Sequence, residues 1–190
     1  WRYGTSGAFC TSPSLGYDML YFASYDRNIY CLDDKGELYW KTKISDIVKL
    51  PLAIWDGKLF AVTQDSWIIA INPLLGNVVW QKKFSDEEFM APAFHQDFML
   101  LANYKGELAA INFQNAQIRW AMALPAAPTT SPIVLKDSFF IGTEEGLMAY
   151  KIDTLECIKY LEGQRIAAIV PTALGLFVAT DKKLVKLVPQ

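Results

Sequence analysis

The sequence has few of the side chains from which metal and catalytic sites are most often built. It contains 1 histidine and 3 cysteines in 190 residues, and no cysteines are spaced as Cys-x-x-Cys. His95 with Cys10, Cys31 and Cys157 gives too few ligands at usable spacing for a zinc site. Reduced thiols are the expectation, with a Cys10–Cys31 disulfide as the alternative. We expect neither a metal nor a cofactor.

Long apolar runs and a marked charge imbalance are also missing. The longest apolar runs, such as AAIV at 167–170, are strand-sized and far below the ~18 residues of a membrane-spanning helix. A formal net charge of −2 gives no reason to expect nucleic acid or an anionic membrane surface as a partner. No signal peptide is visible and the chain starts at Trp1 without a methionine, which favours a processed product or a part of a longer protein.

What the sequence does contain is an internal repeat of about forty residues. Trp40, Trp80 and Trp120 fall in one column at that interval, Tyr160 takes the same place in the next copy, and Trp1 lies one residue out of step. A second column runs in parallel, and its members are Pro13, Pro51, Pro92, Pro132 and Pro171. Two independent columns with one period indicate real repeats.

Each copy reads as about four short antiparallel strands. Runs rich in Val, Ile, Phe, Tyr and Leu, such as 19–24, 58–63 and 98–103, alternate with turns rich in Gly, Asp and Asn, as strands and hairpins do. A single sheet of this kind cannot bury itself, and radial stacking of copies gives a β-propeller. The tryptophans then fill the gaps between blades.

These features predict an all-β fold, a five-bladed β-propeller of four-stranded antiparallel blades in a single domain, 1–190. The predicted blades are 7–45, 46–85, 86–125, 126–164, and 165–190 together with 1–6. The N-terminal strand is expected to close the last blade, which would hide both sheet edges. The alternative is five blades cut from a larger ring.

The copies resemble the repeats of pyrroloquinoline-quinone-like β-propellers, whose docking motif reads roughly A-x-D/N-x-x-x-G-x-x-x-W. The second copy matches it with Ala70, Asn72, Gly76 and Trp80, and the third has Ala116 in the glycine place. The resemblance implies a blade architecture and says little about function. The quinone-dependent dehydrogenases of the family use more blades, a calcium ion and adjacent cysteines, and this chain has no adjacent cysteines. It is more similar to the noncatalytic branch, such as the propeller lipoprotein of the outer-membrane protein assembly machine, where the ring is a docking surface.

The predicted inner strands lack catalytic side chains. They surround the proline column, and Lys49 is the only charged residue within them. Glycoside hydrolysis needs paired carboxylates at the channel, and the sequence places none there. His95 falls in a predicted peripheral turn, where solvation explains it better than a catalytic triad. We expect no enzymatic activity.

Six residues are candidates for contact with a protein partner. Asp86, Glu87, Glu88 and Phe89 form an acidic run that links two repeats, and Trp55 and Trp67 stand outside the tryptophan column. The competing interpretations are an ordinary solvated face for the acidic residues, blade packing for Phe89 and local hydrophobic cover for the two tryptophans. Trp1, Trp40, Trp80, Trp120 and Tyr160 are assigned to blade docking.

The sequence therefore predicts a noncatalytic propeller that serves as a protein-interaction scaffold or docking subunit. A small-ligand or carbohydrate sensor is the alternative, and a quinone-dependent or glycoside-cleaving enzyme is the least favoured. The resemblance points to the periplasm or another extracytoplasmic compartment. The odd cysteine count favours the alternative, the cytoplasm.

Overall fold

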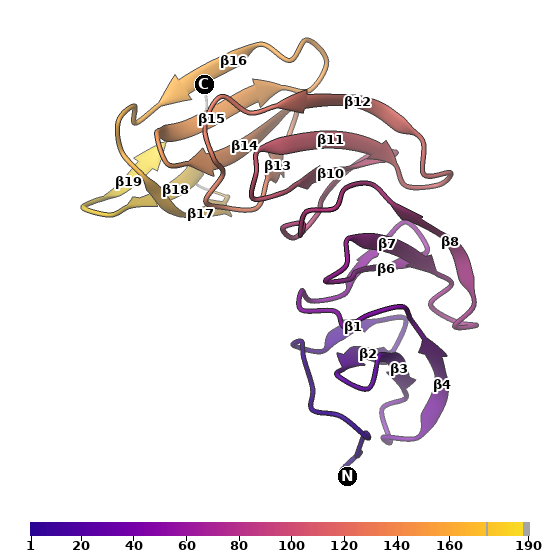
Figure 1. Ribbon diagram of the computed structural model, residues 1–190. Helices are drawn as coiled ribbons and strands as arrows, with labels where there is room; N and C mark the ends of the chain where they lie inside the picture. The colour runs from indigo at the N-terminus through magenta and orange to yellow at the C-terminus, as the bar shows by residue number, and fades with distance from the viewer. Residues whose placement is uncertain (174, 188–190) are drawn as a thin grey trace. The chain divides into compact units, whose positions relative to one another are not determined.

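The computed structural model describes residues 1–173 and 175–187, and every regular element in that part of the chain is a β-strand. The chain forms two compact units, 1–89 and 90–190. Within each sheet the strands pair antiparallel in chain order (Figure 1). The all-β class and the antiparallel four-stranded repeats predicted from the sequence are confirmed for four sheets.

The first unit contains two four-stranded sheets. The first sheet consists of β1 (Ser14–Gly16), β2 (Met19–Ser24), β3 (Asn28–Leu32) and β4 (Leu38–Lys43). The second consists of β5 (Ala53–Trp55), β6 (Lys58–Val62), β7 (Trp67–Ile71) and β8 (Val78–Lys83). Alternate side chains of β2 and β3 pack against alternate side chains of β6 and β7. The buried residues at this contact include Tyr21, Ala23, Ile29, Cys31, Leu59, Ala61, Ile69 and Ile71.

The second unit contains two four-stranded sheets and one three-stranded sheet. The third sheet has β9 (Ala93–His95), β10 (Phe98–Ala102), β11 (Glu107–Asn112) and β12 (Ile118–Ala123). The fourth has β13 (Ile133–Leu135), β14 (Ser138–Thr143), β15 (Gly146–Lys151) and β16 (Cys157–Tyr160). The fifth has β17 (Ile166–Thr172), β18 (Gly175–Thr180) and β19 (Leu184–Leu187).

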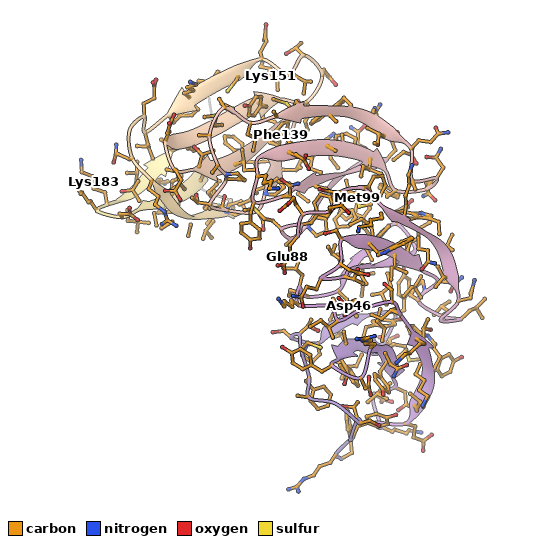
Figure 2. All side chains as sticks on the ribbon, viewed as in Figure 1. Asp46, Glu88, Met99, Phe139, Lys151 and Lys183 are labelled. Carbon is orange, nitrogen blue, oxygen red and sulfur yellow. The ribbon has the colours of Figure 1, made fainter. Side chains whose placement is uncertain are left out.

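An aromatic stack joins the third and fourth sheets. Phe139 on β14 is fully buried, and its ring lies 5.9 Å from the Trp120 ring and 4.9 Å from the Tyr150 ring (Figure 2). Burying one such phenylalanine contributes roughly 1.5–3 kcal/mol, and stacked ring pairs add ~0.5–1.5 kcal/mol each. The two sheets therefore share one core.

Trp40 shows how an indole ring joins neighbouring sheets. Its Nε1 donates a hydrogen bond of 2.9 Å to the Pro73 carbonyl, and its ring lies over Gly76. A Cβ built on Gly76 would lie 2.6 Å from the indole, and the φ of +72° at this position also favours glycine. Trp1 is seated in the same way, over Gly36, with Nε1 2.9 Å from the Asp34 carbonyl.

The fourth repeat departs from this pattern. In the first three sheets a register shift precedes the outer strand's tryptophan, which pairs with Cys31, Ala70 or Ala110. The β15–β16 pairing has no such shift, so Ile158 pairs with Ala149 and Tyr160 pairs with Leu147. Sequence spacing had set Tyr160 in the tryptophan column, whereas the pairing sets Ile158 there. Because β16 lacks the extra residue that causes the register shift in the other outer strands, it pairs with β15 in continuous register.

The N-terminal residues of the described chain form no named strand. Residues 7–10 run beside β2, with Tyr25 N donating to the Ala8 carbonyl at 2.9 Å and an isolated bridge between Phe9 and Ser24. The fifth sheet has three strands, β17 to β19, and the predicted closing strand is not among them. Closure by the N-terminal segment stays a prediction.

Two glycines with the same backbone angle test the docking contact. Gly57 and Gly76 both have φ +72°, but a Cβ on Gly57 meets no described atom within 4 Å. We expect Gly57→Ala to cost roughly 1–2 kcal/mol, because of left-handed backbone alone. Gly76→Ala adds an overpacking penalty of about 1–3 kcal/mol against Trp40. Urea unfolding of both variants measures the difference, and equal losses would show that the indole does not rest on Gly76.

Candidate functional site

One end of the first unit gathers most of the candidate residues. The turn between β2 and β3, the turn between β6 and β7, and the links 44–52 and 84–89 all lie at this end, because strands pair in chain order. Ser66 in the β6–β7 turn donates a 2.6 Å hydrogen bond to the Glu87 carbonyl, which fixes the acidic link to the second sheet. The local sequence thus positions the acidic run beside a hairpin turn.

The carboxylates of the acidic link are paired with lysines. Asp86 lies 2.8 Å from Lys83 Nζ, and Glu88 lies 3.7 Å from Lys49 Nζ. The hydrogen bond from Lys83 lowers the pKa of Asp86 below its ordinary value. Both pairs are exposed to solvent, which screens them, so neither adds much to stability. The link is therefore charged and accessible without being a free acidic patch.

A second group of charges lies at the same end. Arg27 Nε is 3.8 Å from Asp46 Oδ1, and the Tyr30 hydroxyl donates a 2.6 Å hydrogen bond to Asp26. Burial raises the pKa of Tyr30 to about 12, helped by the neighbouring Asp26. For Asp26, burial acts to raise the pKa, but the hydrogen bonds from Tyr30, Asn28 and Ser24 outweigh it and the pKa falls below its ordinary value. Asp26 is therefore ionised at neutral pH.

We call this surface the charged edge. Its members carry both signs and form the ion pairs Arg27–Asp46, Lys49–Glu88 and Lys83–Asp86, and Asp46 and Glu88 are labelled in Figure 2. The charged edge consists of Asp26, Arg27, Asp46, Lys49, Lys83, Asp86 and Glu88. Sequence analysis named Asp86 and Glu88 and did not identify the ion pairs Lys49–Glu88 and Arg27–Asp46. The available signal was weak, because the partners are 19 and 39 residues apart in the chain.

Two of the predicted contact residues belong to the interior. Phe89 is 5% exposed, so it packs in the core and is not a surface anchor, which corrects the sequence-based assignment. Trp67 is half-buried and packs against the core between the first and second sheets. Its Cα pairs with that of Lys83, so it lies beside the charged edge.

Trp55 lies apart from the other candidates. It ends β5, beside the β5–β6 turn, whereas the charged edge lies at the β6–β7 turn, the opposite end of β6. Its side chain is 38% exposed. The structure therefore brings together Trp67, Asp86, Glu87 and Glu88, and it separates Trp55 from them.

The metal, thiol and charge sites considered from the sequence can each be checked in the structure. Lys49, the single charged side chain predicted for the inner strands, is engaged with Glu88. Within residues 1–173 and 175–187, no three His, Cys, Asp or Glu side chains gather as a metal site. Cys10, Cys31 and Cys157 are free thiols, and the Cys10–Cys31 disulfide does not form. In the same part of the chain, no helix has the length and apolarity to span a membrane.

Comparison with known proteins identifies related sequences. The family profile described as outer membrane protein assembly factor BamB matches residues 1–173. The chain is 32% identical over 108 residues to outer membrane protein assembly factor BamB of Francisella tularensis, an alignment of 56% of this chain and 23% of that protein. It is 28% identical over 138 residues to the protein of the same name from Shewanella oneidensis, covering 62% and 35%. The chain thus spans about a third or less of these relatives.

Solved structures share the fold. The crystal structure of BamB from Moraxella catarrhalis superposes with a TM-score of 0.73 at 16% identity, over 98% of this chain and 63% of that one. The computationally designed Ika8 protein gives 0.78 at 13% identity, over 93% and 57%. A 74-residue stretch is 36% identical to quinoprotein ethanol dehydrogenase of Pseudomonas aeruginosa, covering 34% of this chain and 12% of that enzyme. The described sheets are those of a propeller.

Phe89 and Glu88 are neighbours that test the division between core and surface. We expect Phe89→Ala to lower the free energy of unfolding by about 3–5 kcal/mol, because it empties a buried site. Glu88→Gln, which breaks an exposed ion pair, is expected to cost about 1 kcal/mol or less. Thermal or urea unfolding of both variants gives the comparison. A small loss of unfolding free energy for Phe89→Ala would show that this side chain is not part of the core.

Proposed function

The chain belongs to the family of outer membrane protein assembly factor BamB, and on that premise we propose that it is a noncatalytic β-propeller that docks other proteins during outer-membrane protein assembly. The observation that carries the proposal is the family match over residues 1–173. Membership also supports a periplasmic location. The assembly function is named for the relatives, and its extension to this chain is our inference.

The charged edge is the surface we assign to docking. It combines both charges with the neighbouring, half-buried Trp67, and its ion pairs are exposed and weak. A partner can exchange such pairs for its own at little cost, and mixed charge then favours the correct partner and orientation. The free thiols and the lack of a grouped metal site in the described residues are compatible with this function and do not establish it.

The similarity to a quinoprotein dehydrogenase is explained by the shared repeat. It covers 12% of that enzyme, which is too short to carry a whole catalytic site. The Ala-x-Asn-x-x-x-Gly-x-x-x-Trp motif at 70–80 supplies Gly76, on which Trp40 rests, so packing between sheets accounts for it. We therefore give the scaffold function precedence over an enzymatic one.

Affinity purification from the native cell envelope tests the docking proposal. The tagged chain is expected to retain subunits of the outer-membrane protein assembly machinery, identified by mass spectrometry. Lys49→Glu, which places a negative charge beside Glu88, is expected to weaken that retention at least tenfold. Lys159→Glu, an exposed change on β16, is the matched control and is expected to leave retention unchanged. Failure of the unaltered chain to retain any assembly subunit, with saturable binding of a sugar, would favour the sensor function instead.

We further propose that the N-terminal segment completes the fifth sheet, so that the chain forms one five-bladed propeller domain. Trp1 lies over Gly36 as Trp40 lies over Gly76. This is the contact that a tryptophan makes when it comes from the outer strand of an adjacent sheet. The fifth sheet has three described strands where the others have four. The first sheet also carries an apolar pocket of 250 Å³, lined by residues that include Phe9 and Phe22. A completed sheet would cover it.

A cysteine pair tests closure. The β18–β19 register matches that of β6–β7, so the pairing of Gln81 with Ile69 predicts that Arg2 pairs with Val185. We expect Arg2→Cys with Val185→Cys to form a disulfide on mild oxidation, because paired Cα atoms lie within ~4.5–5.5 Å. Arg2→Cys with Lys159→Cys is the control. Peptide mapping by mass spectrometry detects the bond. No bond, or equal yields for both pairs, would favour blades of a larger ring.

A further inference from the structure

A pocket of 240 Å³ opens between the third and fourth sheets, in the second unit. The turn between β9 and β10, the strand β12, the turn between β13 and β14 and the turn between β15 and β16 contribute to it. Its lining includes the Trp120 indole and the side chains of His95, Arg119, Asp137 and Asp153. It lies in a different unit from the charged edge, so it is a separate site.

The cation in the pocket is already neutralised. Arg119 Nη1 lies 2.9 Å from Asp97 Oδ1, and the guanidinium lies 5.2 Å from the centre of the Phe98 ring. Arg119 is therefore held as an internal ion pair and a cation–π contact. It leaves the remaining carboxylates of the pocket without a counter-charge.

Asp137 and Asp153 are the two uncompensated carboxylates. Neither side chain makes a hydrogen bond or an ion pair with any residue of 1–173 or 175–187. Both come from tight turns at the rim of the pocket, beside β14 and before β16. The pocket therefore holds two carboxylates that no described side chain pairs with.

Asp153 lacks a hydrogen-bond partner among the described residues because the turn of the fourth repeat differs from the turns of the first three. In the first three repeats the turn side chain accepts hydrogen bonds from amides of its own turn, as Asn72 Oδ1 does from Leu74 and Leu75 at 2.9 and 3.0 Å. Lys151 occupies that place in the fourth repeat, because Leu155 N donates to its carbonyl as Gly76 N does to Asn72. Lysine has no acceptor, and it lies exposed before β16 (Figure 2). The acidic residue stands two positions later, outside the turn's own hydrogen bonds.

We propose that this pocket binds a cationic side chain, arginine or lysine, presented by a protein partner. The two carboxylates supply the opposite charge, and the Trp120 indole supplies an aromatic wall for a cation. One face of that indole stacks with Phe139 at 5.9 Å and an interplanar angle of 22°, so the ring is held in place before any ligand arrives. The identification of the ligand as a partner's side chain rests on the docking function proposed above, whereas the cation preference does not.

Titration with a small probe tests the pocket on the isolated chain. N-acetyl-L-arginine amide and N-acetyl-L-lysine amide are added to the 15N-labelled protein, with N-acetyl-L-leucine amide as the uncharged probe, and the tryptophan indole N–H signals are followed by NMR. We expect a saturable shift of one indole signal, that of Trp120, with the cationic probes only. Because the attraction is electrostatic, the binding is expected to weaken as salt rises.

Two pairs of substitutions distinguish binding in the pocket from an effect of the overall negative charge of the protein. Asp137→Asn with Asp153→Asn is expected to weaken probe binding at least tenfold. Glu145→Gln with Glu162→Gln removes the same charge from exposed positions at the opposite end of the fourth sheet and is expected to leave it unchanged. Arg119→Gln frees Asp97 and is expected to tighten binding. No saturable shift, or equal weakening by both pairs of substitutions, overturns the proposal.

The partner assay separates this inference from the proposed function. If the unaltered chain retains assembly subunits while no cationic probe binds, the docking function stands and the pocket is refuted. If the probes bind and Asp137→Asn with Asp153→Asn leaves retention of those subunits unchanged, the assignment of the pocket to that partner is refuted. Weakened retention together with lost probe binding supports both.

Discussion

The contact between an indole ring and a glycine of the neighbouring sheet is the interaction on which this fold depends. Sheets with two apolar faces must stack, and Trp40 over Gly76 shows how they are held at close range. A register shift before the tryptophan, a turn amide or carboxylate, and a left-handed glycine all serve this one contact. Each of the three is a short-range feature of the sequence, which is why one motif can build a whole architecture by repetition.

The parts of the fold that depend on such short-range features were predictable from the sequence. The run at 19–24 is β2, and the docking of Trp40 follows from its interval and from Gly76. Tyr160 was set wrongly because it was placed by its interval alone, whereas the fourth repeat has Glu156 in the glycine place and its outer strand lacks the register shift. Phe89 was named as a contact candidate with blade packing as its alternative, and its burial favours the alternative. The pairs Arg27–Asp46 and Lys49–Glu88 depend on tertiary placement.

Both surfaces that we propose for binding lie at the ends of the sheets. The central strands are committed to packing: all five residues of β10 are buried. Residues of the turns and links do not pack in the core. One charged residue there can therefore be replaced by another without loss of core packing. The charged edge in the first unit and the pocket beside Trp120 in the second are two outcomes of that freedom, and the second arises where a repeat has lost its own docking motif.

The pairing of strands in chain order has a consequence for synthesis. Because each sheet is drawn from one stretch of about forty residues, a ribosome working at about 5–20 residues per second releases the material for one sheet every few seconds. A newly made sheet can complete its internal hydrogen bonds at once. Its second apolar face, however, stays exposed to solvent until the next sheet emerges. Pauses in translation within the second repeat would thus leave Tyr21 and Ile29 of the first sheet open to chaperones or to aggregation.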